Sequence, residues 1–321
     1  RSACDGIRIG GDLILAPGVT KDVTLVDCVI QGNIRNYGTG EVRFEAPQIT
    51  PESTATKPSE VYKPGATLDR TLEYGGKTVP IYRDRPLNVF SDVDFIWTGE
   101  ENENQRRLEY LGGEFRTRYG IDVSSFQGEI DWDAVADDNI DFAMVRVGFR
   151  GTGTGSLNTD KYYEQNIRGA MRAGLETGVY FFAQAVTVEE AIEEADYVIS
   201  LLDGLDINGP VAYDWEMHDS TYRVYGTSPE MATACAVAFC ERIKDAGYTP
   251  MVYGGTYVTY MKYDQGALAD YLSWYPEYKS EKSEKLCPTL VYHMDYWQFS
   301  STRAVAGING RVDMNIQFIR R

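Results

Sequence analysis

Histidine is scarce in this sequence, and cysteine is too sparse and too irregularly spaced to organise the chain. Among 321 residues there are two histidines and five cysteines, and no two cysteines form a Cys-x-x-Cys pair. This composition argues against a structural zinc site and against a disulfide framework. Cys4 and Cys28 could pair in an exported protein, but buried free thiols would leave the same pattern in the sequence.

The sequence also lacks long apolar runs and an excess of basic residues. No stretch approaches the roughly 18 apolar residues that cross a bilayer, and no basic segment followed by an apolar one opens the chain. Acidic residues outnumber basic ones by 48 to 31, which gives a net charge of −17. Nucleic acid is therefore not expected as the main partner, because phosphate binding needs a basic footprint.

The first third of the chain differs in pattern from the rest. Short β-branched runs broken by Gly, Pro and Asn predict consecutive short strands there. The segment from Pro47 to Ala66 is rich in Pro, Ser and Thr and predicts a loop or linker. We therefore predict two domains: a small β-rich accessory region over residues 1–116 and a second domain over 117–321.

From Tyr119 onward, strand patterns alternate with helical ones. Eight segments carry strand patterns: YGIDVSS, FAMVRVGF, TGVYFFAQA, PVAYDWE, TPMVYGG, YLSWYPEY, LVYHMDYWQFS and RVDMNIQFI. Asp131, Thr187 and Ser228 are expected to begin helices as N-caps. Strand-helix alternation predicts a parallel sheet, and eight strands favour a closed TIM-like barrel in the α/β class, with about five helices.

Acidic residues recur at the predicted strand ends. Asp122 closes the first strand, and Asp313 lies in the last. Asp214 and Glu216 close the fourth, and their i, i+2 spacing places both carboxyl groups on one face of the strand. The carboxyl ends of barrel strands form the active site, so four acids would meet at one mouth. Paired carboxylates suit glycoside hydrolysis, whereas isolated acids would merely cap turns.

Aromatic and basic side chains lie near the same strand ends. The candidate substrate contacts are Arg146, Tyr180, Phe182, Tyr253, Trp274, Tyr278 and Trp297. An aromatic ring offers a flat apolar platform for a sugar face, and Trp274 and Trp297 are the strongest candidates for that role. Arg146 could pair with one of the acids. Packing in the barrel core is the competing interpretation for the aromatic residues.

The segment from Tyr119 to about Phe318 resembles the lysozymes of glycoside hydrolase family 25, which are N-acetylmuramidases. The matching segments, in order, are GIDVSSFQGEIDW, FAMVRVGF, Asp160 and Asn166 with AGLETGVYFF, the DWE acids, WYPEY and WQFSSTRAVAGINGRVDMN. The resemblance implies a barrel of eight strands with five helices. It also implies hydrolysis of the β-1,4 bond between N-acetylmuramic acid and N-acetylglucosamine in peptidoglycan, outside the cell or at the cell wall, without metal or cofactor.

The resemblance further implies residue roles. Glu216 would be the general acid, Asp214 its partner, and Asp122 and Asp313 would complete the acidic mouth. We expect Asp214 to stay ionised while Glu216 holds the proton. The backbone spacing does not decide whether Asp214 acts as a nucleophile or activates a water molecule. We favour a third route, in which the substrate's 2-acetamido oxygen attacks the anomeric carbon and configuration is retained.

Two segments depart from the family pattern. Many relatives have Tyr-His-Phe where this chain has Tyr180-Phe181-Phe182, and the familiar Trp-x-Ala-x-Tyr appears here as WYPEY. Both departures would alter the sugar subsites and leave the acids in place.

Two other functions compete with peptidoglycan hydrolysis. The first is a barrel that binds cell-wall glycan without cutting it, and its signature would be the loss of an acid. All four acids are present, which favours the enzyme. The second is a hydrolase of another N-acetylated glycan, such as chitin, which product analysis would distinguish.

Overall fold

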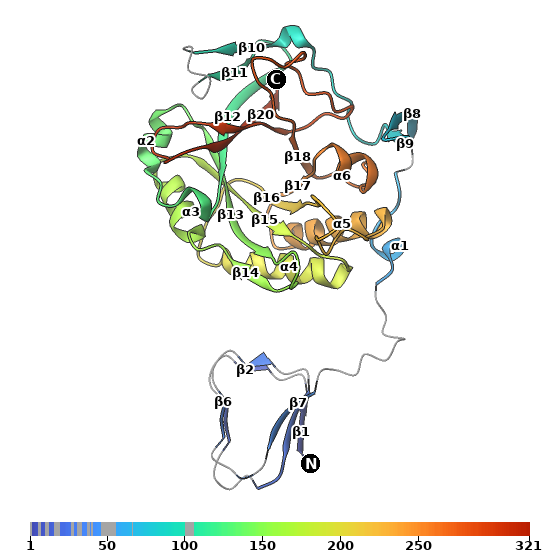
Figure 1. The fold of residues 1–321 in the computed structure, drawn as a ribbon, viewed down its shortest axis with the longest axis vertical. Helices are drawn as coiled ribbons and strands as arrows, with labels where there is room; N and C mark the ends of the chain where they lie inside the picture. Colours follow the sequence, from blue (N-terminus) through green and yellow to red (C-terminus); the bar gives the residue numbers. More distant parts are fainter. Residues whose placement is uncertain are drawn as a thin grey trace. The chain divides into compact units, whose positions relative to one another are not determined.

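The chain forms two compact units, Arg1–Thr54 and Ala55–Arg321, which Figure 1 shows in a computed structural model. The structure describes residues 56–65, 67–99 and 106–321. Before residue 56 it describes the segments 2–5, 8–9, 13–15, 20–26, 29–30, 34–36, 39 and 41–45. The possible pairing of Cys4 with Cys28 lies outside the side chains described. Cys235, Cys240 and Cys287 are buried free thiols.

The first unit is a small coil of parallel strands, in agreement with the β-rich region predicted there. Each of the first four strands pairs with the third strand after it. The pairs are β1 (Ser2–Asp5) with β4 (Val23–Val26), β4 with β7 (Val42–Glu45), β2 (Arg8–Ile9) with β5 (Val29–Ile30), and β3 (Leu13–Leu15) with β6 (Ile34–Asn36). The first residues of three pairs match Ser2 to Val23, Arg8 to Val29 and Leu13 to Ile34, an offset of 21 residues. In the fourth pair Val23 matches Val42, an offset of 19. The nearly constant offset indicates a repeating unit of the solenoid kind.

The second unit contains a closed eight-stranded barrel, as predicted. Its strands are β12 (Phe115–Val123), β13 (Phe142–Arg150), β15 (Glu176–Ala183), β16 (Val211–Trp215), β17 (Pro250–Tyr253), β18 (Leu272–Pro276), β19 (Tyr296–Arg303) and β20 (Val312–Arg320). The barrel closes because β12 pairs with both β13 and β20. The first seven strands run parallel, whereas β20 is antiparallel to both of its neighbours. The short β14 (Leu157–Thr159) pairs with the end of β13.

Helices surround the early strands of the barrel. They are α2 (Trp132–Asp137), α3 (Tyr163–Arg172), α4 (Val188–Leu201), α5 (Pro229–Asp245) and α6 (Thr256–Met261). The side chains of Asp131, Thr187 and Ser228 cap α2, α4 and α5 as predicted. Gly174 ends α3 with a positive φ of 84°, a conformation that favours glycine. No helix in the described ranges is both long and apolar enough to span a membrane.

Residues 58–110, predicted to belong to the accessory region, lie in the second unit instead. They form α1 (Pro58–Val61), β8 (Leu68–Tyr74), β9 (Lys77–Tyr82), β10 (Phe95–Thr98) and β11 (Arg107–Tyr110), with short 3-10 turns at Asp92–Asp94 and, past β12, at Ser125–Gln127. Ile81, Phe95 and Leu108 are buried in the same hydrophobic core as the barrel residues. The compact unit therefore begins at Ala55, while the division at residue 116 remains a prediction about which part folds alone.

Two truncations test that division. Each large apolar side chain buried in a core contributes roughly 1.5–3 kcal/mol, so removal of Ile81, Phe95 and Leu108 should destabilise the barrel by several times that amount. We expect residues 55–321 to melt as one cooperative unit and residues 115–321 to melt at a much lower temperature. Calorimetry of both chains provides the measurement. Equal melting temperatures would support the division at residue 116 instead.

Candidate active site

The four predicted acids lie together at one end of the barrel. Asp122 lies near the end of β12, Asp214 lies in β16, and Glu216 directly follows β16. Asp313 is near the start of β20, and since β20 runs antiparallel, its start lies at the same end as the ends of the other strands. Asp122 and Asp313 are directly paired in register. All four line one cavity of about 320 Å³.

Most of the predicted substrate contacts line the same cavity. They are Arg146, Tyr180, Phe182, Tyr253, Trp274 and Tyr278. Trp274 is only 2% exposed, and its ring meets Tyr180 and Tyr253 edge-on, with centroids 5.8 and 4.9 Å away. These three rings form an aromatic wall in the cavity.

Trp297 is the predicted contact that the structure places elsewhere. Its side chain is fully buried, its indole N–H donates to the Glu277 carbonyl at 3.0 Å, and its ring packs edge-on against Phe95. Successive residues of a strand face opposite sides, so Gln298 faces the cavity in its place. The prediction that Trp297 stacks on a sugar is therefore corrected: its side chain packs beneath β10 instead.

Arg146 pairs with an acid outside the group of four. Its Nε and terminal nitrogen contact Asp160 Oδ2 at 2.9 and 2.8 Å, and Asp160 is fully buried. The guanidinium also lies over the Phe126 and Phe149 rings. Arg146 is thereby fixed at the cavity wall, and its charge opposes the rise in the pKa of Asp214 that burial causes.

Two amide side chains that sequence reasoning missed hold Asp122 in place. Gln298 Nε2 and Asn315 Nδ2 each donate to Asp122 Oδ2 at 2.8 Å. Asp313 and Asn315 have the same i, i+2 spacing as Asp214 and Glu216, so the strand pattern could have revealed Asn315.

Aromatic side chains fix the orientation of these amides. The Trp274 indole N–H donates to Asn315 Oδ1 at 2.8 Å. The hydroxyl groups of Tyr253 and Tyr278 donate to Gln298 Oε1 at 3.1 and 3.0 Å. With their oxygens occupied in this way, both amides present their N–H groups to Asp122. This network favours the ionised form of Asp122, whereas burial disfavours that form.

Both Asp122 and Asp313 have a raised pKa, and that of Asp313 is raised further. Burial raises the pKa of Asp122 to about 6, although the hydrogen bonds from Asn315 and Gln298 oppose the rise. Burial and the charges of Asp122 and Glu216 raise the pKa of Asp313 to about 8. Asp313 therefore keeps its proton to a higher pH than Asp122 does.

The carboxyl groups of Asp214 and Glu216 lie close enough for each to affect the pKa of the other. Burial, followed by the charge of Glu216, raises the pKa of Asp214 well above its ordinary range. Burial also raises the pKa of Glu216, but His218 opposes the rise, with its Nε2 3.0 Å from Glu216 Oε2. The free structure thus favours a proton on Asp214, contrary to the expectation that Asp214 stays ionised, because Asp214 lies deeper than Glu216.

Glu216 lies where two hollows meet. A second hollow of about 310 Å³ is lined by Trp215, Met217, Gly255, Thr256, Tyr257, Val258 and Pro276. Glu216, His218, Tyr253 and Tyr278 line both hollows. Glu216 therefore has room for a ligand on two sides. Within the described part of the chain, no group of three or more His, Cys, Asp or Glu residues could hold a metal ion.

A closed barrel with an acidic, aromatic-walled mouth is an architecture suited to glycoside hydrolases. The chain belongs to the glycosyl hydrolases family 25, whose family model matches residues 121–308.

Relatives of this chain include lysozymes. It is 25% identical over 197 residues to the autolytic lysozyme of Clostridium acetobutylicum, and this match covers 61% of the chain and 54% of that protein. It is 27% identical over 201 residues to lysozyme M1 of Streptomyces globisporus, covering 61% of the chain and 66% of the relative. The chain thus spans about half to two thirds of these relatives. The crystal structure of a bacterial lysozyme from Streptomyces coelicolor matches with a TM-score of 0.50 and 26% identity, covering 62% of this chain and 90% of the other.

Proposed function

We propose that this protein hydrolyses the β-1,4 bond between N-acetylmuramic acid and N-acetylglucosamine in bacterial peptidoglycan, acting outside the cell or at the cell wall. The observation that carries the proposal is the position of Glu216, a carboxyl group of raised pKa between two hollows at the mouth of a family 25 barrel. A scissile bond over Glu216 would have sugars in both hollows. Lysozyme relatives favour peptidoglycan as the glycan.

Product analysis tests the substrate. Purified peptidoglycan should release fragments that end in reducing N-acetylmuramic acid, as measured by mass spectrometry after borohydride reduction. Reducing N-acetylglucosamine ends, or cleavage of chitin oligosaccharides alone, would contradict the proposal. Tight binding of peptidoglycan without any fragment release would instead favour a binding module.

In this mechanism Glu216 protonates the leaving oxygen. Asp122, held ionised by Gln298 and Asn315, supplies a fixed negative charge where positive charge develops on the sugar ring. Asp313, protonated near neutral pH, can donate a hydrogen bond to a sugar hydroxyl. A bound sugar also excludes water from the mouth, which strengthens each of these electrostatic interactions.

Asp214 is proposed to assist the attacking group in the same displacement in which Glu216 protonates the leaving oxygen. In the complex the proton shared by the pair must reside on Glu216, which leaves Asp214 as an anion. That anion can accept a hydrogen bond from the acetamido N–H and balance the charge of the ring that forms when the acetamido oxygen attacks. Participation of the substrate in this way is an accepted variant of the two-carboxylate scheme.

Retention of configuration is the expected result of that route. The first product observed by proton NMR, before mutarotation, should be the β-anomer of the new reducing sugar. Each of the two displacements inverts the anomeric carbon, so their sum retains it. A first-formed α-anomer would rule out both acetamido participation and a covalent Asp214 intermediate.

His218 should set the alkaline limit of activity. The histidine lowers the pKa of Glu216, so its removal should raise that pKa and keep the acid protonated to higher pH. We expect the alkaline limb of the pH profile of kcat/KM to move upward in His218→Gln, with turnover at the optimum changed only several-fold. Asp219→Asn, which alters a neighbouring charge without contacting Glu216, is the matched control. An unmoved limb in His218→Gln would contradict this role.

A further inference from the structure

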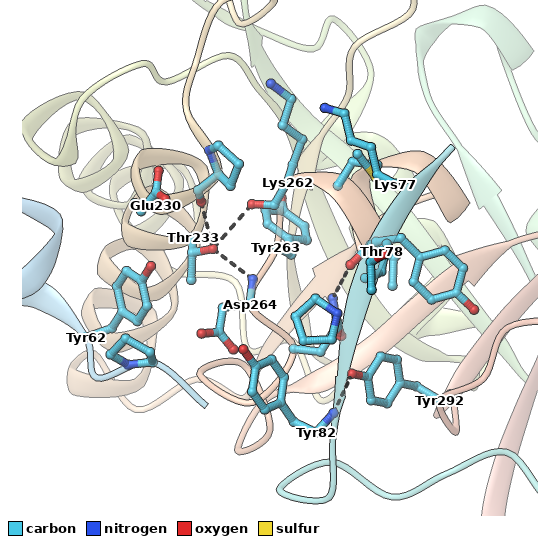
Figure 2. A pocket seen from close by; sticks show the side chains of 18 residues that line it. Tyr62, Lys77, Thr78, Tyr82, Glu230, Thr233, Lys262, Tyr263, Asp264 and Tyr292 are labelled. Carbon is cyan, nitrogen blue, oxygen red and sulfur yellow. Dashed lines mark hydrogen bonds between the residues drawn. The ribbon is translucent and has the colours of Figure 1, made fainter. Parts of the chain in front are cut away.

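A further cavity, of about 440 Å³, lies in the same compact unit and shares no lining residue with the two hollows beside Glu216. Its walls come from residues 62–82 on one side and from α5, α6 and the segment after α6 on the other (Figure 2). We call it the tyrosine cavity, after Tyr62, Tyr82, Tyr260, Tyr263 and Tyr292, which line it. Residues 62–82 lie outside the part matched by the family model.

One wall of the tyrosine cavity is a strand edge. Among the described strands, β9 pairs only with β8. The Tyr82 N–H points away from β8, since it donates to the Tyr292 hydroxyl at 3.0 Å. Backbone groups alternate in direction along an antiparallel strand, so Thr78 and Pro80 present their free groups on the same side as Tyr82. Proline is tolerated where its missing N–H faces away from the neighbouring strand, which fits Pro80 at this position.

The strand edge suits an extended peptide. An unpaired edge offers main-chain hydrogen bonds to an added strand, and pockets beside it accept alternate side chains. Thr78 offers an N–H and a carbonyl, and Pro80 offers a carbonyl. The tyrosine rings supply rigid apolar walls, and the volume lies within the range of small-ligand sites.

Two lysines at one edge of the cavity indicate the charge of the ligand. Lys77 and Lys262 lie side by side there (Figure 2), and the charge of Lys77, after burial, lowers the pKa of Lys262. Lys262 is only 9% exposed, and its Nζ donates to the Thr227 carbonyl at 2.6 Å. Glu230 and Asp264 also line the cavity, but no salt bridge joins either lysine to a carboxylate in the described part of the chain. The Asp264 carboxylate instead accepts hydrogen bonds from the backbone N–H groups of residues 65, 266 and 267. Two adjacent lysines that no carboxylate contacts favour a ligand that carries one.

We propose that the tyrosine cavity binds an extended peptide that bears a free carboxylate, added as a strand along β9 with its carboxylate at Lys77 and Lys262. Resting on the proposed function, that peptide is the stem attached to the glycan being cut. Peptide is favoured over glycan because a sugar chain uses neither the free strand edge nor the paired cations.

Binding experiments on the full chain with Glu216→Gln, which removes cutting, test the site. The probe is the stem peptide released from purified peptidoglycan by an amidase, and the comparison probe is the glycan left behind. Calorimetric titration should show peptide binding that weakens at least tenfold in Lys77→Gln. Lys285→Gln, an exposed lysine outside the cavity, is the matched control and should bind like the parent.

A pair of variants at Thr78 isolates the strand edge. Thr78→Pro removes the outward N–H and should weaken peptide binding, whereas Thr78→Val keeps the N–H and should not. Melting temperatures near that of the parent verify that the hairpin is intact. Loss of binding in Lys77→Gln alone supports the carboxylate contact even if Thr78→Pro unfolds the hairpin.

Three results would overturn the inference. They are absence of peptide binding, equal binding by Lys77→Gln and the parent, and Lys77-dependent binding of the peptide-free glycan, which would make this a sugar site. Failure of the proposed function appears separately, as a full-length parent that binds the peptide but releases no fragments from peptidoglycan.

Discussion

Replacement of Glu216 by Gln is expected to lower kcat on peptidoglycan by about 10³- to 10⁴-fold, near the upper end of what general acid catalysis contributes. Gln has the same shape but cannot donate a carboxyl proton to the leaving oxygen. The KM should change little, because the two hollows keep their walls. Release of reducing ends from purified peptidoglycan provides the measurement.

Asp133→Asn is the matched control for this variant. Asp133 is an exposed acid in the first turn of α2, outside both the mouth and the tyrosine cavity, and its loss removes the same charge from the chain. Its activity should equal that of the parent. If Glu216→Gln clears cell walls at a rate near the parent's, another residue supplies the proton and the assignment fails.

Replacement of Asp122 by Asn should lower kcat by about 10²- to 10³-fold, the range seen when one preorganised electrostatic group is removed. The variant removes the fixed negative charge that Gln298 and Asn315 hold at the sugar ring. The melting temperature above pH 6 should stay the same or rise. Burial raises the pKa of Asp122 to about 6, so the ionised form costs stability that is absent below its unfolded pKa and grows as pH rises toward 6.

Asp313→Asn provides the comparison, because the pKa of Asp313 is raised to about 8 and its carboxyl is already neutral at pH 7. We expect a smaller loss than in Asp122→Asn at pH 7, with the difference narrowing as pH falls below 6. Full activity in both variants would mean that these acids are ordinary strand-end residues.

Sequence patterns predicted the parts of the fold that depend on local chemistry. The side chains of Asp131, Thr187 and Ser228 cap helices as expected, because a cap is specified within one turn of chain. Asp214 and Glu216 share the mouth as expected, because the spacing on a strand determines the face of each residue.

Other features depend on contacts between distant segments and could not be read locally. Apolar residues such as Ile81 and Leu108 indicate burial but not against which partner, so their place in the barrel's core was missed. Which of Trp297 and Gln298 faces the cavity could not be decided without knowing the pleat of β19. The repeat of the first unit was hidden because its strands are only two to four residues long.

Closure of the barrel by β20 ties the timing of activity to synthesis of the chain. The hydrogen bond from Asn315 to Asp122 can form only after the chain has been synthesised for a further 193 residues. At typical translation rates that interval lasts roughly 10–40 s. A chain still on the ribosome would carry the proposed acid and its partner, Glu216 and Asp214, while the seam of the barrel stays open and Asp122 lacks the Asn315 amide. The proposed active site would therefore be complete only when β20 is inserted, in the same event that closes the barrel.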